Sequence, residues 1–182
     1  MSALTVRDAV EDDLPAIVAI YNATVPGRTV TADTEPVSVA SRQPWFREHR
    51  PGFRPLWVAE LDGQVVAWLS FSSFYGRPAY NATAEISIYV APEHRLKGIG
   101  RELLQRSIDH APSAGVKTLL GFIFAQNEPS LRLFRLYGFE QWACLPDVAE
   151  LDGIGRSLLI LGKRVHDGHD GHNGHNGDNS SE

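Results

Sequence analysis

One short segment places three cations and two glycines between a strand and a helix. The segment runs from Ala91 to Arg101 and reads Ala-Pro-Glu-His-Arg-Leu-Lys-Gly-Ile-Gly-Arg. The free N–H groups and the dipole at the start of a helix favour an anion. Glycines at 98 and 100 remove Cβ atoms that would keep a diphosphate away from the backbone. We therefore expect a phosphate-bearing ligand here, the alternative being an ordinary turn in which glycine serves the geometry.

The spacing of the glycines narrows the class of phosphate site. The segment lacks the Gly-x-x-x-x-Gly-Lys-Ser/Thr pattern of nucleotide triphosphatases. It also lacks the Gly-x-Gly-x-x-Gly pattern of dinucleotide-binding folds. The sequence therefore argues against both of these classes.

A carboxylate, Glu85, interrupts the apolar strand that precedes this segment. Alternation over residues 84–90 places the isoleucine and valine side chains on one face, with Glu85, Ser87 and Tyr89 on the other. A carboxylate in such a place can accept a proton as a general base. The alternative is a glutamate that simply faces solvent.

Strands and helices alternate around these residues. Strands are predicted near 4–9, 56–60, 64–71, 84–90, 118–124 and 157–161, and helices near 12–21, 38–50, 100–111 and 130–137. Asp62-Gly63 predicts a tight hairpin turn between two of the strands. The expected fold class is α/β, with one mixed sheet covered by helices.

The motif Arg95-x-x-Gly98-x-Gly100 after such a strand resembles the GNAT superfamily of N-acetyltransferases, which bind acetyl-CoA. Later in the chain, Asn127-Glu-Pro-Ser130 and Leu136-Tyr-Gly-Phe139 resemble the superfamily pattern of an Asn that opens a short helix ending in Gly-Phe before another strand. The resemblance covers essentially residues 4–165. It implies a single GNAT-like domain over residues 1–165, with a mixed, mostly antiparallel central sheet and helices on both faces.

The stretch from Arg77 to Glu85 resembles the phosphinothricin and methionine sulfoximine N-acetyltransferases within that superfamily. The resemblance implies that Glu85 is the general base, and that the acetyl group passes by direct attack to the amino group of a small amino-acid-like substrate. Arg77 and Tyr80 are the substrate candidates, since a guanidinium fork suits a carboxylate or phosphinate. Two alternatives stay open: an acetyltransferase for another amine such as a protein N-terminus, and a non-catalytic protein that binds acetyl-CoA or metal.

Acetyl-CoA is assigned by the same resemblance to strand backbone, the glycine loop and the start of the later helix. These residues are Ile88, Tyr89, Val90, Arg95, Leu96, Lys97, Gly98, Ile99, Gly100, Arg101, Asn127 and Ser130. The pantetheine arm is expected to lie along the strand like an added half-strand. A homodimer is likewise implied by the resemblance alone.

One position departs from the superfamily pattern. Phe134 stands where the superfamily often has Tyr, and the phosphinothricin subgroup His, to protonate the departing thiolate. A thiol is acidic enough for its thiolate to leave without strong protonation, so the departure bears on rate and subgroup more than on reaction type.

Composition bounds the environment of the 182-residue chain. A single cysteine, Cys144, excludes an intrachain disulfide framework. Neither a signal-peptide pattern nor a long uninterrupted apolar run is present in the sequence. We expect a soluble protein of the cytoplasm that binds neither membrane nor nucleic acid, because the net charge of -5 opposes contact with many phosphates.

Residues 166–182 differ from the rest of the chain in composition. They have no apolar side chain, four acids, no Lys or Arg, and a His at every third position from 166 to 175. Such a segment cannot bury surface to offset its chain entropy, so a disordered tail is predicted. Its imidazoles could bind Ni²⁺, Zn²⁺ or Cu²⁺, or the tail could be only a solubilising extension; no other metal site is expected.

Overall fold

The computed structural model describes residues 3–166, and a seven-stranded sheet runs through them. The strands are β1 (Thr5–Asp8), β2 (Leu56–Leu61), β3 (Gln64–Ser73), β4 (Thr83–Val90), β5 (Thr118–Phe124), β6 (Glu140–Leu151) and β7 (Ile154–Arg164). The helices are α1 (Leu14–Asn22), α2 (Val39–Arg47), α3 (Ile99–His110) and α4 (Glu128–Leu136). The strand order is β1-β2-β3-β4-β5-β7-β6, and every neighbouring pair is antiparallel except β4 and β5. The predicted α/β fold with a mixed, mostly antiparallel sheet is confirmed.

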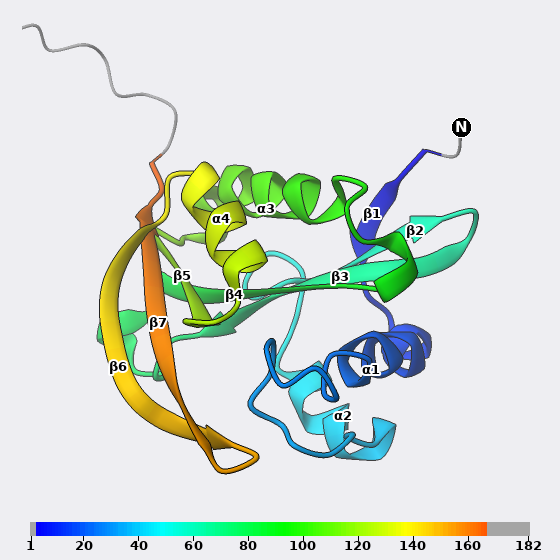
Figure 1. Ribbon diagram of the computed structural model, residues 1–182. Coiled ribbons are helices and arrows are strands. Elements are labelled where there is room, and N and C mark those ends of the chain that lie inside the picture. The colour runs from blue at the N-terminus through cyan, green and yellow to red at the C-terminus, as the bar shows by residue number, and fades with distance from the viewer. Residues whose placement is uncertain (1–2, 167–182) are drawn as a thin grey trace, which may run out of the picture.

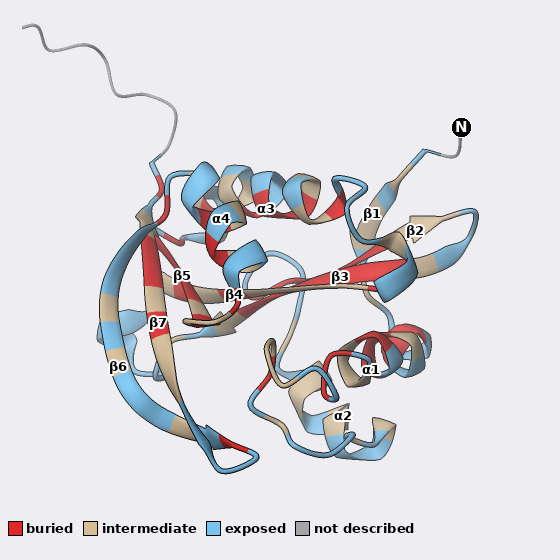
Figure 2. Cartoon of the chain, viewed as in Figure 1, coloured by how far each residue is buried: buried red, intermediate tan, exposed pale blue. Residues whose placement is uncertain are grey.

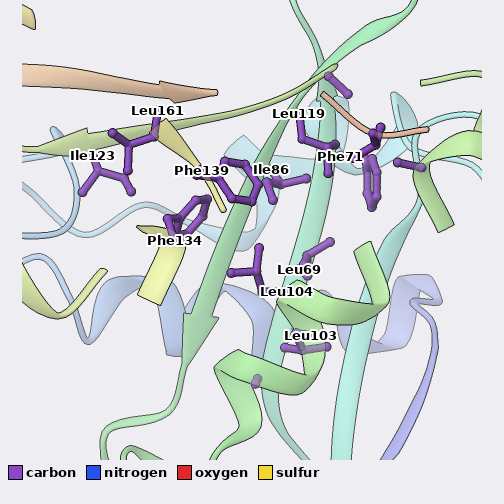
Figure 3. Close-up of a cluster of buried hydrophobic side chains, with 14 of the residues drawn as sticks. Leu69, Phe71, Ile86, Leu103, Leu104, Leu119, Ile123, Phe134, Phe139 and Leu161 are labelled. Carbon is purple, nitrogen blue, oxygen red and sulfur yellow. The ribbon is translucent and has the colours of Figure 1, made fainter. Parts of the chain in front are cut away.

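Helices cover both faces of the sheet: α3 and α4 lie on one face, α1 and α2 on the other (Figure 1). Side chains alternate between the two faces of the central strands, so the same strands contribute to both hydrophobic clusters. Leu69 and Ile86 point into the cluster under α3, whereas Trp68 points into the cluster under α1. Figure 3 shows the larger cluster, in which side chains of β3, β4, β5, β7, α3 and α4 meet.

Local signals fix where the helices begin. Ser38 caps α2, its Oγ accepting from the Ser41 N–H at 3.1 Å, and Asn127 caps α4 through the Ser130 N–H at 3.3 Å. Gly98 precedes α3 with φ = 80°, a left-handed conformation that glycine adopts without steric cost. The helix that opens at Asn127 therefore begins two residues before the predicted range.

The predicted elements are found near their expected ranges, with one exception. β5 spans the predicted residues 118–124, and the Asp62-Gly63 turn has positive φ at both residues, 50° and 76°. No range was predicted for β6, which has twelve residues and is largely exposed along its length (Figure 2). The resemblance implied only that some strand follows Phe139.

Two further predictions concern contact with a membrane and the C-terminal tail. Within 3–166, no helix is long and apolar enough to cross a membrane. Of the predicted tail, only His166 belongs to the described residues, so the prediction of disorder from 167 onward lies outside them.

Candidate active site

β4 and β5 pair along only three residues and then separate. The parallel register joins Thr83, Ala84 and Glu85 to Thr118, Leu119 and Leu120. Beyond Glu85, β4 keeps its antiparallel partner β3 as far as Val90, and β5 keeps β7 as far as Phe124. The facing edges of Ile86–Val90 and Gly121–Phe124 are therefore without a strand partner, and we call this opening the fork.

Two helix N-termini follow the two arms of the fork. α3 starts after β4 through the loop 92–98, and α4 starts after β5 at Asn127. Ligands of open α/β sheets bind beyond the carboxyl ends of parallel strands, where helix N-termini attract anions. An extended ligand in the fork with a diphosphate at the α3 end matches this arrangement.

The loop at the α3 end presents free positive charge. Arg95, Lys97 and Arg101 are exposed, and none of them forms an ion pair with another described residue. Leu96 has φ = 61° and its side chain is fully exposed. The loop backbone is thus turned so that cations and N–H groups gather at the start of α3.

The two glycines of this loop do different things. A Cβ on Gly98 would have no heavy atom within 4 Å, so the space beside this backbone is open, as the approach of a diphosphate requires. A Cβ on Gly100 would instead lie 3.5 Å from Leu133 Cδ2 of α4. Gly98 fits the role predicted for both residues, whereas Gly100 faces the packing between α3 and α4.

Asn127 and Ser130 both lie at the start of α4. Asn127 is buried, and its Oδ1 is used to cap the helix through the Ser130 N–H. This hydrogen bond fixes the N-terminal turn of α4 beside the arm of β5. Asn127 and Ser130, which the resemblance assigns to the cofactor, thus lie at the start of a helix beside the β5 arm of the fork.

A cavity of about 200 Å³ lies on the sheet face covered by α1 and α2. Its floor consists of three cross-strand pairs of β3 and β4: Trp68 with Tyr89, Ser70 with Ser87, and Ser72 with Glu85. Side chains of α1, α2 and the segment between them complete the walls: Ile17, Val18, Tyr21, Val37, Arg42 and Trp45. Glu85 is thus both the last paired residue before the fork and part of the cavity floor.

Four aromatic rings in contact line the cavity, two from the sheet and two from the helices that cover it. Trp68 stacks on Tyr89 with ring centroids 4.5 Å apart, and Trp45 meets Trp68 edge-on at 5.5 Å. Tyr21 lies 5.2 Å from Tyr89. The indole N–H of Trp68 donates to the Ile17 carbonyl at 3.1 Å, which ties the sheet to α1. These contacts hold the wall rigid.

The carboxylate of Glu85 has no hydrogen-bond donor or ion-pair partner among residues 3–166. Burial raises the pKa of this carboxyl above its ordinary value, since nothing near it favours the charged form. A carboxylate that is incompletely solvated and unpaired is a better proton acceptor than one in water. The structure thus places Glu85 in a cavity, whereas the alternative was a solvent-facing glutamate.

Phe134 is buried on the opposite side of the sheet from that cavity. Its ring lies against Gly121 of β5 and packs edge-on to Phe139, with centroids 4.9 Å apart. It has no group that can donate a proton, so this position does not supply an acid.

Arg77 and Tyr80 do not line the cavity. Both belong to the exposed loop between β3 and β4, where Arg77 has no described partner and Tyr80 packs edge-on against Phe74 at 5.4 Å. Phe74 in turn lies 6.4 Å from Phe122, which is on the arm of β5. The loop is therefore placed near the fork, outside the cavity that contains Glu85.

Several cavity residues were missed from the sequence. Ser70 and Ser72 interrupt an apolar strand at spacing two, as Glu85 and Ser87 do in β4, and this shared pattern could have identified one polar sheet face. Arg42 and Trp45 follow no periodic pattern, because α2 has no buried residue and its position over the sheet depends on the fold. The stretch from Arg42 to Phe46 also resembles the phosphinothricin subgroup, but this resemblance gave these residues no role in the site.

Sequence comparison identifies the family. The profile described as the Acetyltransferase (GNAT) family matches residues 17–139, which include the floor of the cavity, the fork and the glycine loop. The chain belongs to the GNAT family of acetyltransferases. Acetyl-CoA is the acetyl donor of these enzymes.

Relatives of this GNAT enzyme are similar over nearly their whole length. YwnH of Bacillus subtilis is 51% identical over 163 residues, which are 89% of this chain and 99% of YwnH. The L-methionine sulfoximine/L-methionine sulfone acetyltransferase of Pseudomonas paraeruginosa is 36% identical over 84% of this chain and 89% of its own. A crystal structure of a phosphinothricin acetyltransferase from Sinorhizobium meliloti in complex with acetyl-CoA superposes with a TM-score of 0.85 at 29% identity, covering 94% of this chain and 93% of that one.

Proposed function

We propose that this GNAT enzyme acetylates the amino group of a small amino-acid-like substrate of the phosphinothricin or methionine sulfoximine type, with Glu85 as general base. The observation that carries the assignment is the position of Glu85, which has no partner among residues 3–166 and lies in a cavity of about 200 Å³ adjacent to the fork. A cavity of this volume suits a small amine, and the names of the relatives point to the same substrate class.

The reaction follows from the placement of these groups. Glu85 takes a proton from the ammonium group, directly or through water, and the neutral nitrogen then attacks the thioester carbonyl. The unpaired N–H groups of β4 near Ile88–Val90 can donate to the carbonyl oxygen as its charge develops. The C–N bond forms, the C–S bond breaks, and CoA leaves as a thiolate, which no side chain at position 134 protonates.

The donor is assigned to residues of the fork and the loop. Backbone of Ile88, Tyr89 and Val90 would pair with the pantetheine arm, and the loop Arg95–Arg101 with the start of α4 at Asn127 and Ser130 would receive the remainder. Arg77 and Tyr80 would contact substrate from the loop beside the fork. The catalytic body is residues 1–165, with 166–182 outside it.

A thiol-release assay tests the function. The full chain with acetyl-CoA is offered a panel that contains phosphinothricin, methionine sulfoximine, methionine sulfone, common amino acids and a peptide with a free N-terminus. We expect CoA release with one or more of the amino-acid analogues and little with the peptide. Release only with the peptide would favour the N-terminal acetyltransferase, and acetyl-CoA binding with no release from any amine would favour a non-catalytic role.

A homodimer and a cytoplasmic location belong to the same proposal. β6 pairs with β7 along one edge only, and it leaves Trp142 and Val148 about half exposed at separate points along the strand. An open edge strand with apolar side chains is a surface that a second copy can cover. Light scattering should then give twice the 20.1 kDa chain mass. The single cysteine, Cys144, is exposed and unpaired, which suits a reducing compartment.

A further inference from the structure

A single cation faces the cavity that contains Glu85. Among the cavity-lining residues that the structure describes, Arg42 is the only Lys or Arg and Glu85 the only acid. Arg42 reaches the cavity from α2, which covers the sheet, while Glu85 lies on the sheet itself. A substrate with an amine at Glu85 and an acid group at Arg42 would match the charge of both walls.

Arg42 is held in place by contacts that leave most of its donors free. Its Nη2 donates to Asp33 Oδ2 at 2.9 Å, and its guanidinium lies 5.1 Å from the centre of the Tyr21 ring. A guanidinium has five N–H donors, and neither Nε nor Nη1 of Arg42 has an acceptor among the described residues. The side chain is therefore oriented and still able to bind a carboxylate or phosphinate.

Asp33 is itself fixed by two groups. Besides Arg42 it accepts a hydrogen bond from the Tyr21 hydroxyl, which also contacts Thr31. Asn22 clamps the end of the same segment, since its side chain donates to the Val37 carbonyl and accepts from the Val37 N–H, both at 2.9 Å. The segment between α1 and α2 is thus tied to α1 at both points, and Arg42 is aimed by a rigid support.

We infer that Arg42 is the specificity-determining residue that binds the acid group of the acceptor. The inference rests on the proposed function, because it assigns a role within the acceptor site of that reaction. Arg77, the cation expected from the sequence to do this, is exposed outside the cavity. The substrate class is therefore a compound with an amine and an anionic group, its apolar part against the aromatic side chains of Tyr21, Trp45 and Trp68.

The test compares L-methionine sulfone with its carboxamide, which keeps the amine and removes the negative charge. For Arg42→Gln we expect the KM for the acid to rise about tenfold or more, since a hydrogen-bonded charge is worth about 1.5–3 kcal/mol. The KM for the carboxamide and that for acetyl-CoA should change by less than about twofold on the same reasoning. Arg42→Lys should fall between wild type and Arg42→Gln, and Arg47→Gln, exposed on the same helix, should behave as wild type.

A second variant, Asp33→Asn, tests whether Arg42 binds the acid group of the substrate or only holds the surrounding structure in place. This variant keeps the shape of the side chain and removes the charge that competes with substrate for Arg42. We expect its KM for the acid to stay the same or fall. An equal loss on acid and carboxamide, in Arg42→Gln or in Asp33→Asn, would assign Arg42 a structural role and overturn the inference. Loss of acid selectivity in Arg77→Gln, with none in Arg42→Gln, would transfer the role to Arg77.

Isothermal titration calorimetry measures binding of the acid and the carboxamide directly, so the inference about Arg42 can be tested without turnover. If the wild-type chain releases no CoA with any amine, the proposed function fails, but titration of L-methionine sulfone and its carboxamide still measures binding. Preference for the acid in wild type that disappears in Arg42→Gln supports the inference. Equal binding of the acid and the carboxamide by wild type contradicts it.

Discussion

Among residues 3–166, Glu85 has no hydrogen-bond or ion-pair partner that would stabilise its charge, and two consequences of this can be measured. Replacing it with Gln removes the proton acceptor, so we expect kcat at pH 7 to fall by about 100-fold or more. The loss should shrink at higher pH, where free amine is available without a base. Rates from thiol release across pH 6–9, with Glu150→Gln on β6 as the control, check this. Full activity of Glu85→Gln at pH 7 would remove the assignment.

The same substitution should stabilise the protein in a pH-dependent way. Burial raises the pKa of Glu85, so the folded chain holds its proton to higher pH than the unfolded chain, and stability falls as pH rises through that window. A Gln side chain does not titrate, so it causes no such fall in stability with pH. The Tm of Glu85→Gln should therefore exceed that of wild type by more at pH 7 than at pH 4. For a chain of this size, a change of 1 kcal/mol in the free energy of unfolding shifts Tm by about 2–4 °C. A gap that is independent of pH would contradict the raised pKa.

Gly98 and Gly100 should respond differently to alanine. At Gly98 the left-handed backbone makes alanine cost about 1–2 kcal/mol, and a methyl group would enter the open space beside the loop. At Gly100 the new methyl group meets Leu133 at ordinary contact distance in a helical backbone. We expect a large rise in the KM for acetyl-CoA for Gly98→Ala and less than about a twofold change for Gly100→Ala, since only the first blocks ligand approach. Similar KM values for the two variants would show that the open space is not used.

At the scale of elements, periodicity in the sequence was informative where one face of an element is buried. β4 and β5 were predicted from alternation and a continuous apolar run, and Glu85 was predicted to leave the apolar face, as it does. β6 carries no such signal, because Gln141, Trp142 and Val148 are all exposed and Pro146 interrupts the run. An edge strand held by one neighbour does not need a one-sided pattern.

The cavity could be predicted only in part for a related reason. Its floor comes from adjacent strands whose alternation is visible in the sequence. Arg42 and Trp45 reach it from α2, which follows a segment of sixteen residues held by Asn22 and by the Arg28–Asp152 ion pair at 3.0 Å. Contacts between positions so far apart in the chain leave no periodic trace, so the sequence predicts Arg77, not Arg42, as the cation that binds substrate.

The contact between β5 and α4 depends on the absence of a side chain at Gly121. A Cβ there would lie 2.6 Å from Phe134 Cε1, closer than atoms can pack. We expect Gly121→Ala to lower stability by about 1–3 kcal/mol through overpacking, measured by denaturant unfolding. Combining it with Phe134→Leu, which removes the ring, should recover part of the loss. If the double variant is no more stable than Gly121→Ala alone, the ring is not the source.

For the whole molecule, charge is a poor guide to the ligand, since the formal charge of -5 includes four acids in residues 166–182. Removing these residues should leave the thiol-release rate and the KM for acetyl-CoA within about twofold of wild type, because every residue assigned to the site precedes position 166. Metal-affinity retention of the full chain and its loss on truncation would show separately whether the histidines bind Ni²⁺. Loss of acetylation on truncation would place the tail in the catalytic unit.

Within the described sheet, β4 and β5 pair at only three positions, from Thr83 to Glu85, where the β1–β4 half meets the β5–β7 half. The Lys117 and Thr118 N–H groups also donate to the Ala82 carbonyl, and the Arg28–Asp152 ion pair joins the segment before α2 to the β6–β7 turn. Side chains beneath α3 and α4 pack across the same junction. A ligand lying in the fork would bond to an arm of each half and act as a splint across this narrow joint. If acetyl-CoA occupies the fork as proposed, we expect the sheet to be stiffer with the donor bound than after CoA has left.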